Sequence, residues 1–315
     1  MINPNTGPVV PIPPAYKTDG TLDLEQTVSY LKFLSKNGIT TIMTTAGSSQ
    51  FNLLDKNEIR EFNECCLHNF KGKCILGLPP LSEYHLLKEI KWYNTILFPK
   101  VPPSLMLMYP DRYYNAANII DFFWYMADAS KFSVYFHGMF MRNGRGGTYN
   151  FDSGMISSLS EHKNIKGMKE ETTDLNLAYD TLSQCSSLDK DFEVIVAGGS
   201  MRRFLLLHAA GATTFLSGIG NVYPKIEIEF LKALHIGDLK LATSLIKDYE
   251  DPFFQETMKH GWHRSLRTIL TMSDIMNCGN RAPFSQLTKV EKYGFRKWFE
   301  TMDEQIKSGE YKNEL

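Results

Sequence analysis

The chain has 315 residues, and its 34 Lys and Arg residues nearly balance 35 Asp and Glu residues. The resulting formal charge of -1 provides no long-range field toward phosphate backbones or anionic lipid, so nucleic acid and membranes are not expected partners. The five cysteines include no C-x-x-C, which predicts neither a disulfide framework nor a zinc site. No signal-like start and no apolar run of about 18 residues occurs, so we expect a soluble cytoplasmic protein.

Short β-rich stretches alternate with helical patterns in eight successive units. Strands separated by helices pair in parallel, and eight such units favour a closed barrel over an open sheet. We therefore predict an α/β fold, a (β/α)8 TIM barrel over residues 1–238 with a C-terminal helical tail over residues 239–315 packed on it. The expected strand and helix pairs are 7–16 with 22–38, 40–46 with 55–70, 74–80 with 82–94, 95–103 with 115–130, 132–139 with 152–162, 165–171 with 175–186, 192–199 with 201–211, and 213–221 with 224–238.

Functional groups of such barrels gather at the C-terminal ends of the strands, which directs attention to the sixth strand. Gly167 and Lys169 share one face of that strand because side chains alternate. If this face points into the barrel, the apolar surroundings disfavour a charged amine and leave a neutral one able to attack a carbonyl. The alternative is a strand-end lysine in an ion pair with Glu170 or Glu171.

The segment 164–170, Asn-Ile-Lys-Gly-Met-Lys-Glu, resembles the sixth strand of the dihydrodipicolinate synthase and N-acetylneuraminate lyase family of Schiff-base aldolases. The resemblance extends to about Phe284. It implies that Lys169 forms an imine with the substrate and that neither a metal nor another cofactor is used. It also implies a homotetramer. Supporting matches are 19–23, Gly199, 221–224 and 281–283.

The loop after the second strand departs from the family pattern. The family has Gly-Ser/Thr-Thr-Gly-Glu there, whereas this chain has Ala-Gly-Ser-Ser-Gln at 46–50. The resemblance implies that Ser48 and Ser49 hold the substrate carboxylate, and their backbone amides could cradle it as well. Gly47 lacks the hydroxyl that the family uses in its proton relay.

The fifth strand also departs, because the match of FSVYFHGMFMR places His137 where the family has its catalytic tyrosine. The same match implies that Arg142 contacts the substrate carboxylate. Tyr135 is the other candidate for proton transfer, about 6 to 7 Å deeper in the barrel. We favour His137, since imidazole transfers protons at neutral pH. Further substrate-binding candidates by resemblance are Gly199 and, for the tyrosine that the family borrows across a subunit contact, Tyr109, Tyr113 or Tyr114.

Two other features are open to more than one interpretation. Residues 142–149 combine glycines with arginines and predict either an altered specificity loop or a plain surface loop. His260 and His263 lack a carboxylate or cysteine partner at ligand spacing, so we interpret them as surface-helix residues and expect no metal.

These features together predict a Schiff-base lyase, an aldolase or dehydratase acting on pyruvate or a 2-oxo-3-deoxy sugar acid, with an aldehyde as a further partner. It would break or form a carbon–carbon or carbon–oxygen bond. The alternative is a catalytically impaired paralogue that binds 2-oxo acids or acts as a regulator. A third hypothesis is an unrelated barrel that binds phosphate at the loop 218–221.

Overall fold

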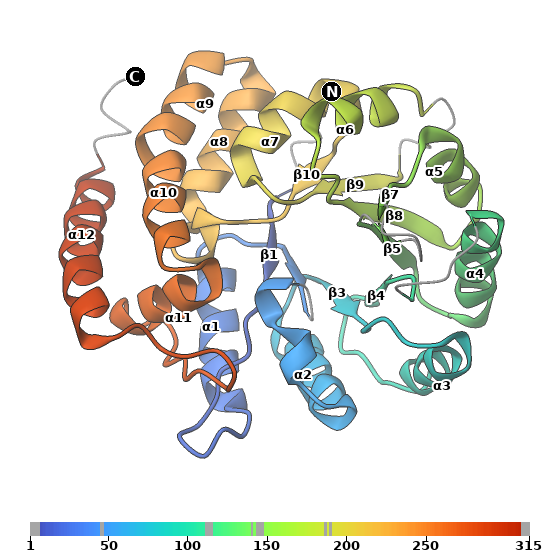
Figure 1. Ribbon diagram of the computed structural model, residues 1–315, viewed down its shortest axis with the longest axis horizontal. Helices are drawn as coiled ribbons and strands as arrows, with labels where there is room; N and C mark the ends of the chain where they lie inside the picture. The colour runs from blue at the N-terminus through green and yellow to red at the C-terminus, as the bar shows by residue number, and fades with distance from the viewer. Residues whose placement is uncertain are drawn as a thin grey trace.

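Eight parallel strands form one sheet that curls into a barrel in the computed structural model, which describes residues 7–44, 47–110, 116–139, 141–142, 148–185, 188 and 191–309. A parallel bridge between Val9 and Leu216 joins the first strand to the last. The prediction of a (β/α)8 barrel is therefore confirmed (Figure 1). In sheet order the strands are β1 (Val9–Pro11), β2 (Thr41–Met43), β3 (Lys73–Gly77), β4 (Ser104–Leu107), β5 (Val134–Gly138), β8 (Ile165–Glu170), β9 (Glu193–Val196) and β10 (Thr214–Phe215).

Helices surround the strands and separate each from the next along the chain (Figure 1). Some of these helices begin with side-chain caps that satisfy free backbone amides, as at α2, where Asp55 and Glu58 form a reciprocal capping box. The outer helices are α1 (Leu24–Lys36), α2 (Lys56–Asn69), α3 (Glu83–Tyr93), α4 (Ala116–Ala129), α5 (Ser153–Ser160), α6 (Leu175–Ser183), α7 (Ser200–Leu207) and α8 (Pro224–Ile236).

The fourth strand lies later in the chain than predicted. We expected it at 95–103, but β4 occupies Ser104–Leu107 and the stretch before it is irregular. The prediction is wrong because Pro99, Pro102 and Pro103 provide no N–H for a ladder, and a central strand cannot lose that many donors. The residues 104–107, Ser-Leu-Met-Leu, are buried throughout and pair with both neighbours.

The barrel interior holds a compact layer of side chains below the strand ends. Val9, Met43, Ile75, Met106, Tyr135 and Ile195 form a buried cluster of their own, separate from the larger core between strands and helices. Lys169 is in register with Ile195 on one side and His137 on the other. Since aligned residues of neighbouring parallel strands point to the same face of the sheet, Lys169 and His137 both point into the barrel, and His137 lies two residues beyond Tyr135 of this layer.

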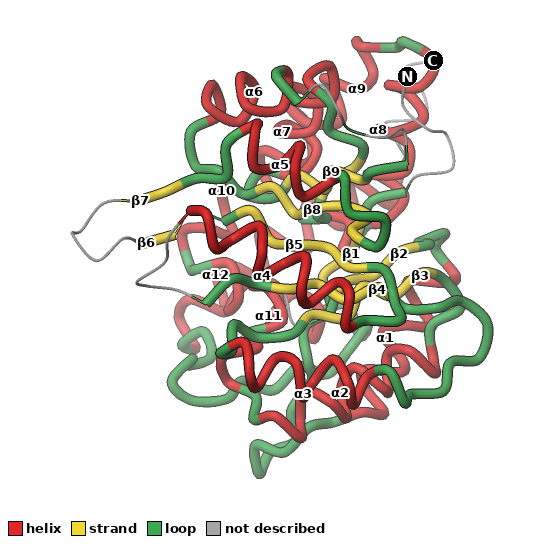
Figure 2. The backbone as a smooth tube through the Cα atoms, turned by 90° about the vertical axis from the view of Figure 1, so that its right-hand side faces the viewer, coloured by secondary structure: helices red, strands yellow, loops and turns green. Residues whose placement is uncertain are grey.

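A two-stranded antiparallel hairpin, absent from the predicted elements, follows the fifth barrel strand. It pairs β6 (Met141–Arg142) with β7 (Thr148–Tyr149). Figure 2 shows the hairpin at the end of the barrel from which the chain leaves β5. Its side chains lie outside the described residues, so the predicted role of this segment in specificity remains a prediction.

The chain after α8 is helical and packs against one side of the barrel. Figure 1 shows α12 lying outside α10 and α11. Within the described part of the chain, none of the helices combines the length and apolar character needed to traverse a bilayer. The elements are α9 (Leu239–Leu245), a π-helical turn η5 (Ile246–Glu250), α10 (Asp251–Lys259), α11 (Trp262–Met272) and α12 (Lys289–Ser308).

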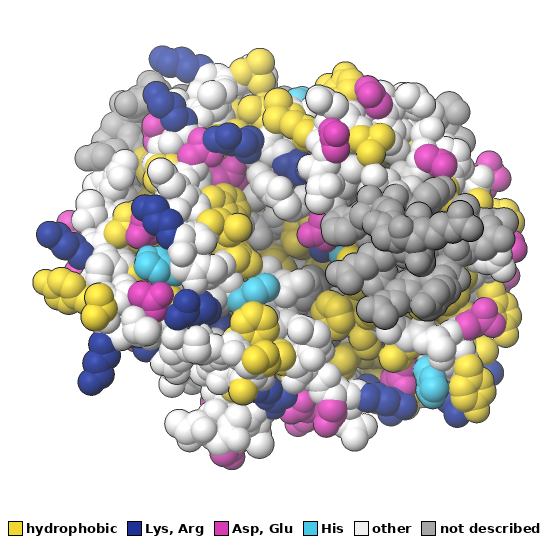
Figure 3. Space-filling view, in the orientation of Figure 1, with side chains coloured by type: hydrophobic (Ala, Val, Ile, Leu, Met, Phe, Trp, Pro, Cys, Tyr) yellow, Lys and Arg dark blue, Asp and Glu magenta, His cyan; other side chains and the backbone are white. Residues whose placement is uncertain are grey.

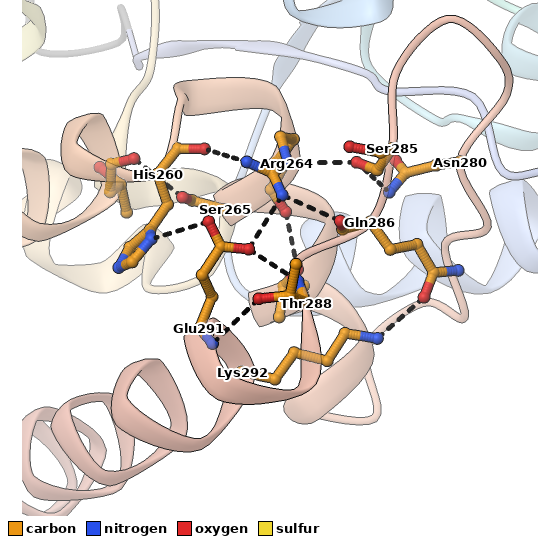
Figure 4. Close-up of polar contacts among 11 residues, drawn as sticks. His260, Arg264, Ser265, Asn280, Ser285, Gln286, Thr288, Glu291 and Lys292 are labelled. Carbon is orange, nitrogen blue, oxygen red and sulfur yellow. Dashed lines mark hydrogen bonds and ion pairs between the residues drawn. The ribbon is translucent and has the colours of Figure 1, made fainter.

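A polar network joins the start of α12 to α11 (Figure 4). Thr288 and Glu291 cap the helix reciprocally, with N–O distances of 2.7 and 3.3 Å. Arg264 donates to Glu291 Oε2 at 3.1 Å and to the Gln286 carbonyl at 2.9 Å. These bonds fix the first turns of α11, the helix that brings Trp262 and His263 to the cavity described below.

Candidate functional site

A cavity of about 820 Å³ opens at the C-terminal ends of the barrel strands. The face that carries the hairpin β6–β7 is hollowed near its middle (Figure 3). One wall comes from strand ends and the loops after β2, β9 and β10, and the other from α10 and α11 of the tail. Among the described residues the lining consists of Gly47, Ser48, Lys169, Glu171, Gly198, Gly199, Ser200, Arg202, Leu216, Ser217, Gly218, Glu250, Asp251, Phe254, Gln255, Met258, Trp262 and His263.

Lys169 lies at the floor of this cavity with only 3% of its side chain exposed. Its Nζ donates to Glu171 Oε2 at 2.8 Å. Sequence analysis offered two interpretations of Lys169, an inward-facing amine or a strand-end lysine in an ion pair. Each holds in part, because the lysine points into the barrel and is also paired with Glu171. A buried amine with one anionic neighbour and access to a cavity is suited to attack a carbonyl once it gives up a proton.

His137 shares the same partner as the lysine. Its Nε2 lies 2.6 Å from Glu171 Oε2, the oxygen that also accepts from Lys169. Burial, and after it the adjacent charge of Lys169, lower the pKa of His137 to about 4, although the contact with Glu171 acts in the opposite direction. The imidazole is therefore neutral at pH 7, and we assign its proton to Nε2 because an ionised carboxylate can only accept.

Glu171 is the acceptor that connects the two predicted site residues. Burial opposes its ionisation, but the hydrogen bond from His137 and the charge of Lys169 outweigh burial and hold the pKa of Glu171 well below its usual range. Sequence analysis considered Glu171 only as an ion-pair partner of Lys169. Its position two residues after Lys169, on the same face of the strand, could have indicated that it also belongs to the site. The resulting lysine, glutamate and histidine group can exchange protons at the cavity floor.

Tyr135, the second candidate for proton transfer, is not brought to this group. Its hydroxyl accepts from Lys73 Nζ at 2.6 Å and donates to Glu193 Oε2 at 2.9 Å. Lys73 and Glu193 are the first residues of β3 and β9, so the hydroxyl lies at the opposite, N-terminal end of the barrel. Gly167 makes room for the ring, since a Cβ there would lie 2.4 Å from a Tyr135 ring carbon.

The loop after β2 does reach the cavity. Gly47 and Ser48 line it, and Ser48 Oγ accepts from Trp262 Nε1 at 3.1 Å, which ties the loop to α11. The backbone of Ser49 ends the short helical turn there, but its side chain lies outside the described residues. Gly199 lines the cavity from the start of α7 with φ of 157°, a conformation that favours glycine.

Among the remaining candidates that the structure describes, Tyr109 does not line the cavity. The Tyr109 ring is half-buried and packs against Phe122 with centroids 5.1 Å apart, and it is absent from the described lining. Tyr113 and Tyr114 lie outside the described residues, as does the side chain of Arg142. His263 differs from the expected surface residue, because it lines the cavity and its Nδ1 is buried. No group of three potential metal ligands occurs within the described ranges.

A second titratable group, Glu250, faces the cavity from the tail. It is 1% exposed and accepts from the backbone amides of Met201 and Arg202 at 2.8 and 2.9 Å. Burial raises the pKa of Glu250 to about 8, and the nearby charge of Glu227 contributes to the rise. Sequence analysis missed this residue because it enters the site only through packing of the tail.

The raised pKa predicts that the free energy of unfolding falls by about 2 kcal/mol between pH 6.5 and 8. Glu250 has an ordinary pKa of 4.5 when unfolded, so over this interval the folded state keeps a proton that the unfolded state has lost. The pKa of His137 is about 4 in the folded state and 6.5 in the unfolded state, so this residue makes the free energy of unfolding rise with pH. That effect falls mainly below pH 6.5. Urea unfolding at both pH values measures the fall.

The matched variant for this measurement is Glu250→Gln, which cannot ionise. Its unfolding free energy is expected to change much less over the same interval. An equal fall in Glu250→Gln and the natural protein would contradict the assignment of the pH dependence to this carboxyl.

Comparison with known proteins shows the family of this chain. The model described as "Dihydrodipicolinate synthetase family" matches residues 144–301, about half of the chain, including Lys169. The chain belongs to the dihydrodipicolinate synthetase family. The predicted resemblance is thereby confirmed, although His137 and the loop after β2 lie outside the matched segment.

Solved structures of the same fold cover nearly the whole chain. The 2-keto-3-deoxygluconate aldolase of Sulfolobus solfataricus superposes with a TM-score of 0.80 at 15% identity, covering 97% of this chain and 99% of its own. The dihydrodipicolinate synthase of Thermotoga maritima gives 0.78 at 17% identity, covering 94% and 98%. A family protein of Escherichia coli K12, solved with pyruvate, gives 0.78 at 15% identity, covering 95% and 98%. No curated protein sequence matches the chain.

The enzymes of the dihydrodipicolinate synthetase family share one general chemistry. Its enzymes are lyases and aldolases acting on pyruvate-type substrates, and they use no cofactor because a lysine forms a Schiff base with the substrate. They are typically oligomeric. The expectation of a cofactor-free mechanism is thus confirmed at the level of the family.

Proposed function

We propose that the protein is a Schiff-base lyase that acts on pyruvate or a 2-oxo-3-deoxy sugar acid through Lys169. The observation that carries this proposal is the buried Nζ at the floor of an 820 Å³ cavity, 2.8 Å from a carboxylate that can take its proton. Ser48, on the cavity wall, is the candidate to hold the substrate carboxylate, with Ser49 and Arg142 as further candidates by resemblance.

In the proposed mechanism Glu171 takes a proton from the Lys169 ammonium. The neutral amine then attacks the C2 carbonyl to give a carbinolamine, which carries no charge on nitrogen. The hydrogen bond from His137 and the charge of Lys169 are the two main influences that lower the pKa of Glu171, so loss of the Lys169 charge makes the carboxylate a better proton acceptor. It returns this proton to the departing hydroxyl, and water leaves as the protonated imine forms.

The protonated imine withdraws electrons from the adjacent carbon and allows an aldol bond to break or form there. In cleavage of a 2-oxo-3-deoxy acid, Glu171 takes the proton of the C4 hydroxyl as the C3–C4 bond breaks, which releases an aldehyde and leaves an enamine. Glu171 returns this proton to the enamine carbon, and water hydrolyses the resulting protonated imine to pyruvate and the Lys169 ammonium. His137 holds Glu171 in place through the 2.6 Å contact and stays neutral. In this proposal Glu171 and His137 perform the proton transfer that the family resemblance assigns to a tyrosine.

Incubation with pyruvate and borohydride tests the proposal directly. Reduction is expected to leave a pyruvyl adduct on one peptide, the one that contains Lys169, as identified by mass spectrometry. An unmodified Lys169 under saturating pyruvate would count decisively against the function, because any turnover by this route requires the imine.

A second candidate function is binding or regulation by a catalytically impaired paralogue. The absence of a hydroxyl at Gly47 and the placement of Tyr135 at the other end of the barrel favour it, since neither relay group is then available. An adduct without product across a panel of 2-oxo acids and aldehydes supports this candidate. Measurable turnover excludes it.

A further inference from the structure

The cavity continues well beyond Lys169, between the barrel and the tail. Its outer part is enclosed by the loops after β9 and β10 and by α10, whose Phe254 packs onto Gly218 so closely that a Cβ there would lie 2.4 Å from the ring. This space can hold the part of a longer substrate that extends beyond an imine at Lys169. The groups on these loops therefore decide what the far end of the substrate can carry.

Barrels of this kind frequently bind phosphate with the backbone amides that follow the seventh and eighth strands and with an adjoining helix N-terminus. The corresponding segments here are the loops after β9 and β10 and the start of α7. The loop amides of Gly218 and Gly220 both donate to Glu227 Oε1, at 2.9 and 3.0 Å. Glu227 is fully buried, and Ser200 Oγ donates to the same oxygen at 3.0 Å.

The amides at the start of α7 are occupied in the same way. Met201 and Arg202 donate to the two oxygens of Glu250, which η5 carries into the cavity wall. A π-helical turn holds one more residue than an α-helical turn, and such turns are frequent at functional sites. The Arg202 side chain, the nearest described cation on α7, is paired with Asp251.

We infer that the outer cavity accepts an uncharged, hydroxyl-bearing substrate chain and rejects a phosphorylated one, with Glu250 as the deciding residue. A phosphate could use the amides of Met201 and Arg202 only by displacing the Glu250 carboxyl group, which would then be buried without these hydrogen bonds. Hydroxyl groups can instead donate to carboxyl oxygens and exchange hydrogen bonds with Ser217 and Gln255 on the same wall. This inference rests on the proposed imine chemistry and specifies its substrate class.

The test compares imine formation by two 2-oxo acids that differ only in a phosphate. Borohydride trapping on Lys169 is measured against concentration for 2-oxo-3-deoxygluconate and for its 6-phosphate, in the intact protein. We expect half-saturation at a concentration at least tenfold lower for the unphosphorylated acid. Equal half-saturation, or a preference for the phosphate, overturns the inference while leaving the proposed function intact.

Two variants test whether Glu250 causes the preference for the unphosphorylated acid. Glu250→Ala frees the amides of Met201 and Arg202 and is expected to reduce the preference by about tenfold, whereas Asp248→Ala, an exposed carboxylate on the same turn, leaves it unchanged. An unaltered preference in folded Glu250→Ala overturns the assignment to this residue. The comparison of the two acids in the natural protein tests the inference without any variant. If pyruvate itself formed no adduct, the proposed function would be overturned.

Discussion

A Lys169→Met variant is expected to form no borohydride-stable adduct and to lose on the order of 10⁴-fold or more in kcat/KM, because no other described group can supply the imine nitrogen. Methionine keeps the length and apolar character of the stem, so the interior packing below it is retained. The loss of charge also has a local consequence. The pKa of His137 is expected to rise, since Lys169 is one of the two influences that lower it.

Lys166→Met is the matched control, because Lys166 lies on the same strand with its side chain on the opposite face. This variant should form the adduct and turn over substrate like the natural protein. NMR titration of the His137 ring measures the change in its pKa in Lys169→Met. Residual adduct at another lysine in that variant would show that the imine position has been misassigned.

The barrel and the inward position of Lys169 could be predicted from the sequence because both depend on local patterns. Alternation of strand and helix signals fixes the topology, and the spacing of Gly167 and Lys169 fixes the face they share. The position of the fourth strand was predicted wrongly, because the apolar residues at 95–103 suggested a strand that the prolines in that stretch prevent. The sequence also left open whether His137 or Tyr135 accompanies the lysine.

The partners of these residues depend on contacts between distant segments. Tyr135 reaches the bottom of the barrel because Lys73 and Glu193, from two other strands, meet its hydroxyl there. Glu250 enters the cavity because the tail packs on the start of α7, 48 residues before it at Arg202. Periodicity within one segment carries no information on such pairings, so the outer wall of the site could not be predicted.

The carboxylate that joins the lysine to the histidine is expected to be the second essential group. Glu171→Ala should slow imine formation by about 10²- to 10⁴-fold, the usual effect of removing a general acid–base group. In its absence the Lys169 proton must pass to solvent, so the rate should rise more steeply with pH than in the natural protein. Added formate should restore part of the rate by occupying the vacated space and accepting the proton.

Glu193→Gln provides the matched control, since Glu193 also pairs with a lysine and an aromatic hydroxyl, but at the N-terminal end of the barrel. That variant should lose stability and keep the pH profile of the natural protein. Rescue by formate separates the two roles that Glu171 could have, because a small acid can replace a proton acceptor but not a structural ion pair. If Glu171→Ala were slow, insensitive to formate and unchanged in its pH dependence, the carboxylate would only position Lys169 and His137, and the amine would lose its proton by another route.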